Sequence, residues 1–376
     1  MKVYLDNAAT TKVSEEVLAE MLPVLKNNFG NPSSTHSYGR EARVLIEKSR
    51  KKIAELLNVT PSEIYFTSGG TESDNTVLRG CVKHLGIKNV ISSKLEHHAV
   101  LHTLEDLENA GEINLSFVEF DENGNIILES LEALLKNNKN ALVSLMHGNN
   151  EIGNINPLKE IGELCQEHGA IFHSDTVQTI GHFNINLQNI DINYIVGSAH
   201  KFHGPKGVGF LYARKDSKLP AYISGGGQER NLRGGTENVY GIVGMAKAFE
   251  LAITNLEEEK AYIEGLKQRM LEGLRENIPG ISFNGDSANL GKSLYTVLNV
   301  SIPPSEKNGL LLFNLDLAGI CVSGGSACAS GAQTGSHVLR ALETNPNNGV
   351  IRFSFSKYNT IEEIDFTIGQ LKRILT

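Results

Sequence analysis

The chain carries one lysine in a setting that favours chemistry. Lys201 lies in "SAHKFHGPKG", directly after the apolar run "INYIVG", with Ser198, His200 and His203 beside it. A lysine in such a crowded pocket can lose its proton and act as a nucleophile or a base. Lys206 is the competing lysine, but it follows a proline in a predicted turn and is better explained as a surface charge or an anion contact.

Two further motifs carry groups that could serve the same ligand. "HSDTVQ" places Asp175 and Gln178 just past an apolar run. The Asp175 carboxylate either faces a cationic ligand atom or caps a helix. "TSGGTES" places Gly70 and Thr71 at a predicted strand-to-helix turn, where glycines let the backbone approach a ligand and the first N–H groups attract an anion. An ordinary glycine turn explains that motif equally well.

The elements that must position these residues follow from the hydrophobic pattern. Between about residue 60 and residue 215, short apolar runs alternate with helical patterns, which is typical of a mostly parallel sheet with helices on its faces. Ligands collect at the carboxyl ends of such strands. The predicted strands and the polar segments that follow them are "EIYF" with "TSGGTESDN", "NVISS" with "KLEHHAV", "ALVSLM" with "HGNNEIG", "AIFHS" with "DTVQ", and "INYIVG" with "SAHKFHGPKG".

A lysine nucleophile, an aspartate and an anion-binding loop together indicate a cofactor. Lys201, Asp175 and the loop at Gly70 are the groups that pyridoxal 5'-phosphate needs: an amine for its aldehyde, a carboxylate for its ring nitrogen and a cradle for its phosphate. A zinc site is the alternative for the histidines, either at His200 and His203 or at His98 and His102. No carboxylate or cysteine completes a ligand set for either pair.

Three other segments carry polar residues whose roles the pattern leaves open. "LEHHAV" holds His97 and His98, of which one could lie against an aromatic ligand and the other face solvent. "GGGQERNLRGGTEN" holds Thr236 and is either an anion-binding or interface loop, or a flexible loop with solvated charges. "NGVIRFSFS" places Arg352 on an apolar strand, where its guanidinium needs a carboxylate or phosphate partner, either structural or from a substrate.

Composition limits the function classes. The 376 residues are 40 % hydrophobic, enough for two domains, and the net charge of −8 with no basic block argues against general binding to nucleic acid or a membrane surface. The four cysteines form no disulfide framework or zinc spacing, which fits a reducing compartment. "MKVYLDNAATT" has no apolar signal segment, and "GLLLFNLDLAGI" (309–320) is too short to span a bilayer, so we predict a soluble, cytoplasmic protein in which 309–320 forms a core helix leading into a strand.

The pattern changes after about residue 257. A long helical segment, "EEEKAYIEGLKQRMLEGLRENI", gives way to the strand-like runs "SLYTVLNVSI" and "GVIRFSFS". We therefore predict a large cofactor-binding domain at 15–257 and a smaller α+β domain formed by 1–14 and 258–376, with a mobile cysteine loop at about 323–337. Cys81 and Cys165 fall in helical patterns, and Cys321 reads as a cysteine of a core strand.

These motifs resemble the cysteine desulfurases, which are class V, fold-type I pyridoxal-phosphate enzymes. The resemblance runs nearly end to end and in the family's order. It rests on "YLDNAATT", "GNPSSTH", "TSGGTESDN", "EHHAV", "MHGNNEIG", "SDTVQTIG", "SAHKFHGPKGVGFLY", "GGGQER", "RGGTEN", "SGGSACAS", "SHVLRAL" and "IRFSFS". The long stretch around Cys328 resembles the group linked to iron–sulfur cluster assembly. The implied fold is a large domain with a mostly parallel seven-stranded sheet flanked by helices, plus a smaller α+β domain.

The resemblance implies roles around the cofactor ring. Lys201 holds the cofactor and removes the α-proton of the substrate, and Asp175 pairs with the ring nitrogen. Gln178 contacts the ring hydroxyl, and His97 stacks on the ring and shuttles protons. Asn150 lies at the cofactor and, with Arg352, holds the substrate carboxylate.

The resemblance also implies a phosphate site and a dimer. Thr71, Ser198 and His200 bind the phosphate together with the backbone of Gly70. Thr236 reaches the phosphate of a neighbouring subunit, which implies a homodimer.

Cys328, in the glycine-rich stretch "SGGSACASG", completes the implied reaction. As a thiolate it takes the sulfur of L-cysteine, becomes a persulfide, and leaves alanine. Gly324, Gly325 and Gly331 would let its loop reach the cofactor and then deliver sulfur to an iron–sulfur scaffold or another acceptor protein. No resident metal is implied, only a transient contact of Cys328 with an iron–sulfur cluster.

Three features depart from the family pattern. The cysteine loop lacks a second serine before its glycine, which we expect to affect stiffness but not chemistry. Gly70 stands where alanine is common, which we expect to be conservative. The chain stops at "LKRILT", without the tail by which long relatives dock a scaffold, so that docking mode is not expected.

Several other functions stay open from the sequence. A selenocysteine lyase or a desulfurase dedicated to tRNA thiolation would share the same fold. An aminotransferase would share it too but would leave Cys328 without a role. A catalytically silent sulfur-transfer scaffold and a zinc hydrolase are alternatives from other classes.

Overall fold

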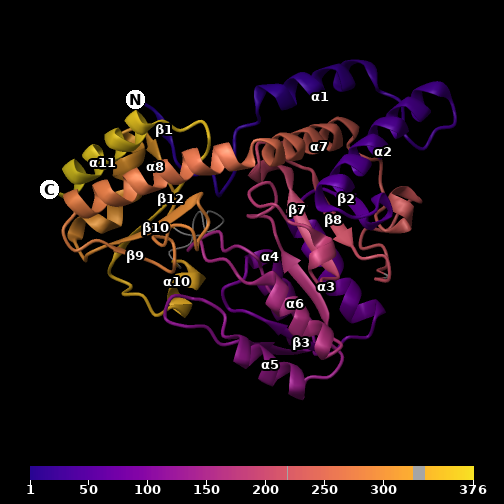
Figure 1. The fold of residues 1–376 in the computed structure, drawn as a ribbon, viewed down its shortest axis with the longest axis horizontal. Helices are drawn as coiled ribbons and strands as arrows, with labels where there is room; N and C mark the ends of the chain where they lie inside the picture. The colour runs from indigo at the N-terminus through magenta and orange to yellow at the C-terminus, as the bar shows by residue number, and fades with distance from the viewer. Residues whose placement is uncertain (218, 325–334) are drawn as a thin grey trace.

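The computed structural model describes residues 1–217, 219–324 and 335–376, and its largest element is a seven-stranded sheet (Figure 1). The strand order is β2-β8-β7-β6-β5-β3-β4. Only β8 runs antiparallel to its neighbours, so the prediction of a mostly parallel sheet is confirmed. The strands are β2 (Ile64–Thr67), β3 (Asn89–Ser92), β4 (Asn114–Phe117), β5 (Ala141–Ser144), β6 (Ile171–Asp175), β7 (Tyr194–Ser198) and β8 (Gly209–Ala213).

Helices cover both faces of this sheet. Side chains alternate between the two faces along each strand, so they are buried on both sides of the sheet. On β5, for example, Leu142 packs into the cluster beneath α3 and α4, whereas Val143 packs into the cluster beneath α1, α2, α5, α6 and α7. Because both faces of such a strand are apolar, its sequence is a continuous run of apolar residues. The helices are α1 (Glu15–Asn27), α2 (Ser37–Leu57), α3 (Gly70–His84), α4 (His98–Asn109), α5 (Leu128–Asn137), α6 (Leu158–Glu167) and α7 (Val239–Thr254).

A separate hydrophobic cluster lies beyond α7. It joins helices α8 and α11 to a three-stranded antiparallel sheet of order β12-β10-β9. Figure 1 shows α8 following α7 end to end and running along this second sheet. The helices and strands that follow α7 are α8 (Leu256–Asn277), β9 (Ser282–Phe283), β10 (Val297–Ile302), α9 (Leu311–Leu317), β11 (Ile320–Cys321), α10 (His337–Ala341), β12 (Gly349–Ser354) and α11 (Ile361–Leu375).

Short 3₁₀ helices occur along the described part of the chain. They are η1 (Pro61–Glu63), η2 (Leu187–Asn189), η3 (Ala199–Lys201), η4 (Gln228–Asn231) and η5 (Glu306–Leu310).

The N-terminal segment belongs to this second cluster. Strand β1 (Val3–Tyr4) pairs in parallel with β11, and the side chains of Val3 and Leu5 are buried in the cluster. Asn7 then donates through Nδ2 to the carbonyl oxygen of Ser354 at 2.8 Å, which ties the segment to the end of β12. The division of the chain at residues 14–15 and 257–258 stays a prediction.

The segment 309–320 differs from the expectation of a core helix. It does form a helix, α9, that leads into β11, but only one side of it is buried. Leu311 and Leu315 are buried, whereas Phe313 is 58 % and Leu317 is 71 % exposed. The helix α9 is amphipathic, and the hydrophobic cluster of α8, α11 and β10 covers only part of its apolar side chains. Among the described residues, no helix has the length and apolarity needed to cross a membrane.

Candidate active site

The polar strand ends meet in one cavity of about 240 Å³. It lies where β6 ends at Asp175, β7 ends at Ser198, and α3 begins at Gly70. The carboxyl ends of the parallel strands therefore face a common ligand space, as the sequence predicts. The cavity is lined by Ala9, Gly70, Thr71, Asp74, His97, Met146, Asn150, Asp175, Val177, Gln178, Ser198, His200 and Lys201.

Lys201 reaches from the large sheet to the N-terminal segment. It ends the 3₁₀ turn η3 that follows β7. Its ammonium nitrogen Nζ donates to the carbonyl oxygens of Ala8 at 2.7 Å and Ala9 at 2.9 Å. The amine is thus held at the wall of the cavity by backbone acceptors. Lys206, by contrast, is exposed, in agreement with its predicted place on the surface.

Asp175 is a buried carboxylate in the same cavity, with only 6 % of its surface exposed. Its Oδ1 accepts a hydrogen bond from the backbone N–H of Val177 at 2.9 Å. The pKa of Asp175 is raised, because the effect of burial exceeds the opposing effects of the Val177 N–H and the charge of Lys201. Gln178 lies alongside and donates through Nε2 to the Ala8 carbonyl at 3.0 Å.

The start of α3 forms the anion end of the cavity. Gly69 precedes the helix with φ of 156°, a conformation that side chains disfavour, and Gly70 and Thr71 open its first turn. First-turn N–H groups have no acceptor within the helix, so they are available to an anion. A Cβ atom on Gly70 would lie 2.6 Å from Cγ2 of Val177. An alanine at residue 70 would therefore require the Val177 side chain to shift.

Two histidines of the cavity are held neutral near pH 7. His97 caps α4, and its Nδ1 accepts a hydrogen bond from the Ala99 N–H at 3.2 Å. Burial, with the charge of Lys201 as the next cause, lowers the pKa of His97 to about 4. The same two causes lower the pKa of His200 to about 4, and its Nδ1 lies 3.2 Å from Oγ1 of Thr10. Neutral imidazoles can accept or pass protons, so both fit a site that handles a substrate proton.

Asn150 lines the cavity, whereas Arg352 lies behind it. Arg352 is on β12, and its Nη1 donates to the backbone oxygen of Asn150 at 3.0 Å. Its Nη2 donates to Oδ1 of Asp6 at 2.9 Å, and its buried Nε has no hydrogen-bond partner. The structure therefore brings the two predicted carboxylate-binding residues together and adds Asp6, which the sequence analysis did not assign.

One predicted residue lies elsewhere, and another falls outside the described residues. Thr236 lines a second cavity of about 120 Å³, which it shares with Arg233 and Glu237, and not the cavity of Lys201. Cys328, together with Gly325 and Gly331, lies outside the described residues, and its role stays a prediction. The cysteines at 81 and 165 are buried in helices, as predicted, and Cys321 is half-buried in β11. In the described part of the chain, no group of His, Cys, Asp or Glu side chains could hold a metal ion.

The sequence analysis missed Asp74 and the backbone of Ala8 and Ala9. Asp74 stands four residues after Gly70 on α3, so one helical turn places it on the side of the helix that faces the cavity. That spacing was a usable signal. No signal could have marked the two alanines, because they contribute carbonyl oxygens that every residue possesses.

The groups present fit pyridoxal 5'-phosphate. One cavity of suitable size holds an amine, a buried carboxylate and a helix start flanked by the hydroxyls of Thr71 and Ser198. The amine and the carboxylate suit the aldehyde and the ring nitrogen, and the helix start suits the phosphate. Lys201 and Asp175 would hold the ring and the α3 turn would hold its phosphate.

Comparisons with known proteins agree with this site. The family model for aminotransferase class-V matches residues 3–366. A cysteine desulfurase IscS of Dictyoglomus turgidum is 42 % identical, over 100 % of this chain and 94 % of its own length. A solved NifS-like protein superposes with a TM-score of 0.91 at 39 % identity, covering 100 % of this chain and 99 % of its own. A structure of SspA in complex with cysteine gives a TM-score of 0.82 at 31 % identity, covering 96 % of this chain and 100 % of its own.

The seven-stranded fold, the cavity around Lys201 and these full-length similarities lead to one conclusion. The chain belongs to the aminotransferase class-V family and, within it, to the pyridoxal-phosphate-dependent cysteine desulfurases.

Proposed function

We propose that this chain removes sulfur from L-cysteine and stores it as a persulfide on Cys328. In this reaction the Cβ–S bond of the substrate breaks, a sulfur–sulfur bond to Cys328 forms, and Cβ gains a proton to give L-alanine. One substrate thiol and one enzyme thiol thus become alanine and one persulfide, without an external oxidant. The observation that carries the proposal is the convergence of Lys201, Asp175 and His97 on one cavity.

The residues of the cavity have different roles in the proposed reaction. Bound pyridoxal phosphate supplies an electron sink for the carbon from which a proton is removed. Lys201 is placed to take the α-proton of the substrate, since its amine lies at the cavity wall. His97, which is neutral near pH 7, is placed to pass a proton to or from the leaving sulfur. Asn150 and Arg352 orient the substrate carboxylate through a guanidinium whose Nε is still unpaired.

The other cysteines are poorly suited to receive sulfur. Burial raises the pKa values of the Cys81 and Cys165 thiols to about 12, so neither forms a thiolate near neutral pH. Cys321 is half-buried in the strand β11. These contrasts support Cys328, which stands among small and polar residues, as the acceptor.

The test measures both products. The holoenzyme is mixed with L-cysteine and a reductant, and alanine and sulfide are quantified for the wild type, Cys328→Ser and the control Cys321→Ser. Equal amounts of both products, lost in Cys328→Ser and kept in Cys321→Ser, are the expected result. Alanine production that survives in Cys328→Ser would overturn the persulfide step. No alanine from L-cysteine but alanine from selenocysteine would instead identify a selenocysteine lyase.

We also infer that the enzyme is a homodimer. Apolar side chains stand exposed on α1 and on the segment that leads into α2: Leu22 is 48 %, Leu25 is 56 % and Phe29 is 76 % exposed. A patch of this kind suits burial against a second copy. Thr236 is exposed and does not line the Lys201 cavity of its own chain, which fits a contact with the partner's phosphate. Light scattering should give twice the monomer mass, and Leu25→Asp with Phe29→Asp should give the monomer.

The protein that receives the sulfur and the cellular compartment of the enzyme are also proposals. We propose transfer of the persulfide to an iron–sulfur assembly scaffold or another acceptor protein, because the chain resembles desulfurases of that kind along its full length. A cytoplasmic location is supported by the described cysteines at 81, 165 and 321, which are all free thiols.

A further inference from the structure

A second carboxyl group lies in the cofactor cavity and has no assigned role. Asp74, on the first turns of α3, lines the cavity with Asp175 and Lys201. Only 1 % of Asp74 is exposed, and neither of its carboxyl oxygens has a hydrogen-bond partner. A buried polar group without a partner is costly, so its persistence at a ligand site calls for a physical explanation.

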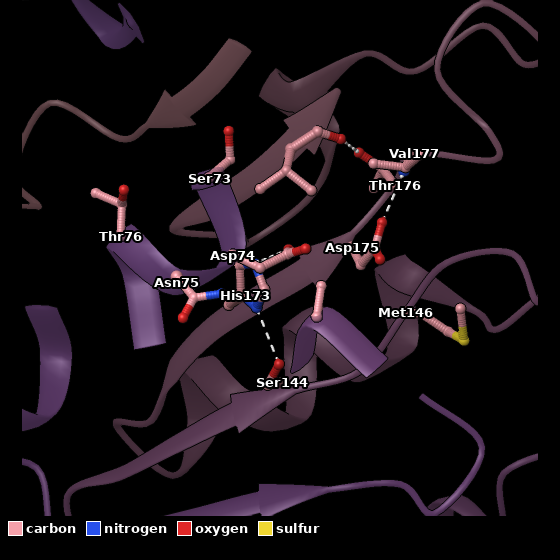
Figure 2. Close-up of polar contacts among 12 residues, drawn as sticks. Ser73, Asp74, Asn75, Thr76, Ser144, Met146, His173, Asp175, Thr176 and Val177 are labelled. Atoms are coloured by element: carbon pink, nitrogen blue, oxygen red, sulfur yellow. Dashed lines mark hydrogen bonds and ion pairs between the residues drawn. The ribbon is translucent and has the colours of Figure 1, made fainter. Parts of the chain in front are cut away.

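The side chain of His173 lies between Asp74 and Ser144 (Figure 2). Nε2 of His173 lies 3.3 Å from Oδ1 of Asp74, and Nδ1 of His173 lies 2.9 Å from Oγ of Ser144. His173 is on β6, two residues before Asp175, so both side chains leave the same face of that strand. The line Ser144–His173–Asp74 therefore ends in the cavity next to the carboxylate predicted to hold the ring nitrogen.

The titratable groups that face Asp74 are mainly acidic. Burial, then the charges of Asp175 and Glu96, raise the pKa of Asp74 well above its usual range. Burial lowers the pKa of His173 to about 3, so the imidazole does not offer a compensating positive charge. Lys201 is the nearby cation, and its influence falls on Asp175. Asp175 also has a raised pKa, but its Oδ1 accepts the Val177 N–H, and this hydrogen bond and Lys201 both favour its charged form. Asp74 has no such hydrogen bond, so the proton of this pair belongs on Asp74.

We propose that Asp74 is a positioning residue that stays a neutral carboxylic acid, with its O–H directed at Nε2 of His173, so that Asp175 alone presents a negative charge to the ring nitrogen. In this arrangement Nδ1–H of His173 donates to Ser144, and Nε2 is left as the acceptor. An ionised Asp74 would place two like charges at the ring nitrogen, and Asp175 would hold a proton more readily. The role at the ring nitrogen rests on the proposed function, but the protonation of Asp74 does not.

The first test reads the proton directly. Infrared spectra of the holoenzyme are recorded at neutral pH in H₂O and D₂O for the wild type, Asp74→Asn and Glu96→Gln. A protonated carboxyl gives a C=O band that shifts in D₂O. Burial raises the pKa of Glu96 as well, so two such bands are expected. We expect Asp74→Asn to lose one band and Glu96→Gln to lose the other. If Asp74→Asn keeps both bands and loses a carboxylate band instead, the proposal is wrong.

The second test reads the consequence for the cofactor. Asparagine can still donate to His173, whereas alanine leaves its buried Nε2 without a partner. Asp74→Ala should weaken cofactor binding about tenfold and shift the pH at which the cofactor absorbance titrates. Asp74→Asn should restore both values to within about threefold and about 0.3 pH units of the wild type. If Asn and Ala behave alike, the negative charge of Asp74 and not its hydrogen bond matters, and the proposal is overturned.

The two proposals can fail separately. A chain that binds pyridoxal phosphate and shows the Asp74 band, but makes no alanine from L-cysteine, would contradict the proposed function and keep this inference. A chain that makes alanine, but shows Asp74 as a carboxylate, would do the reverse.

Discussion

Arg352 on β12 forms an ion pair with Asp6 of the N-terminal segment, with Nη2 and Oδ1 2.9 Å apart and only 1 % of the arginine side chain exposed. The two residues are 346 positions apart in the chain. The same guanidinium holds the backbone oxygen of Asn150. One side chain thus joins β12 and the N-terminal segment to the loop after β5, at the edge of the cofactor cavity.

This ion pair leads to a prediction about substrate affinity. Arg352→Lys replaces a planar fork by a point charge, so it should raise the KM for L-cysteine about tenfold while the cofactor stays bound. Steady-state kinetics with occupancy from absorbance measure both. Asp6→Asn is the companion variant and should lower the KM slightly, because it removes a competitor for the guanidinium. A loss of cofactor with an unchanged KM would show that Arg352 has a structural role only.

The close contact between β7 and β8 predicts a different defect. Gly197 precedes Ser198, and a Cβ atom there would overlap the ring of Phe210. Gly197→Ala should therefore displace the end of β7 and reduce cofactor occupancy at least several-fold, which absorbance of the purified protein measures. Gly265→Ala is the control. Residue 265 lies in α8 with no atom within 4 Å of the new Cβ, so this change should stabilise the protein by about 0.5 to 1 kcal/mol.

A buried ion pair holds the glycine-rich loop that carries Thr236. Glu229 accepts hydrogen bonds from both terminal nitrogens of Arg50, at 2.7 and 2.9 Å, and from the N–H of Phe66 at 2.8 Å. The backbone of Glu229 adopts the left-handed conformation, with φ of 45°. Glu229→Gln leaves the buried Arg50 guanidinium with only the half-exposed Glu47 as a counter-charge, so urea denaturation should show a loss of about 2 kcal/mol. Glu55→Gln, which breaks an exposed pair with Lys51, should cost less than about 1 kcal/mol.

If both variants lowered stability equally little, the buried pair would contribute no more than a surface pair. The left-handed backbone at residues 229–231 would then need another source of support.

A buried lysine predicts how stability varies with pH. Lys267 is fully buried and donates to Oγ of Ser293 at 2.9 Å and to the carbonyl oxygen of Leu294 at 2.8 Å. Burial lowers its pKa from 10.5 to about 7. Between these values the unfolded chain binds more protons than the folded chain, so the free energy of unfolding should rise with pH.

The expected contribution of Lys267 is about 2 kcal/mol between pH 7 and pH 9. Urea denaturation of the holoenzyme at several pH values measures it, with Lys267→Met as the comparison. The slope should be smaller in Lys267→Met. An identical slope in both proteins would mean that Lys267 keeps its ordinary pKa in the folded state.

Much of the site was predictable because parallel strands bring their carboxyl ends together. Asp175 and Lys201 each follow a continuous apolar run, and this local signal was enough to place both at one edge of the sheet. The chemical type of each residue then indicated the ligand atom that it faces.

The rest depended on long-range contacts that no local pattern encodes. The partnership of Arg352 with Asp6 and the carbonyl oxygens offered to Lys201 by Ala8 and Ala9 require the second cluster to place the N-terminal segment. The exposure of α9 was missed for a similar reason. Its apolar composition indicates burial, but only the packed structure shows how much of its surface the neighbouring strands can cover.

The pairing of the N-terminal segment with β11 and β12 has a consequence for biosynthesis. The first residues to leave the ribosome supply the carbonyl oxygens that hold Lys201, and their segment pairs with Ile320 and Ser354 as well as with His200. A nascent chain therefore gains these two late pairings only after almost its whole length has been translated. Incomplete chains lack these pairing partners, so the complete set of contacts around the N-terminal segment forms only when synthesis is nearly finished.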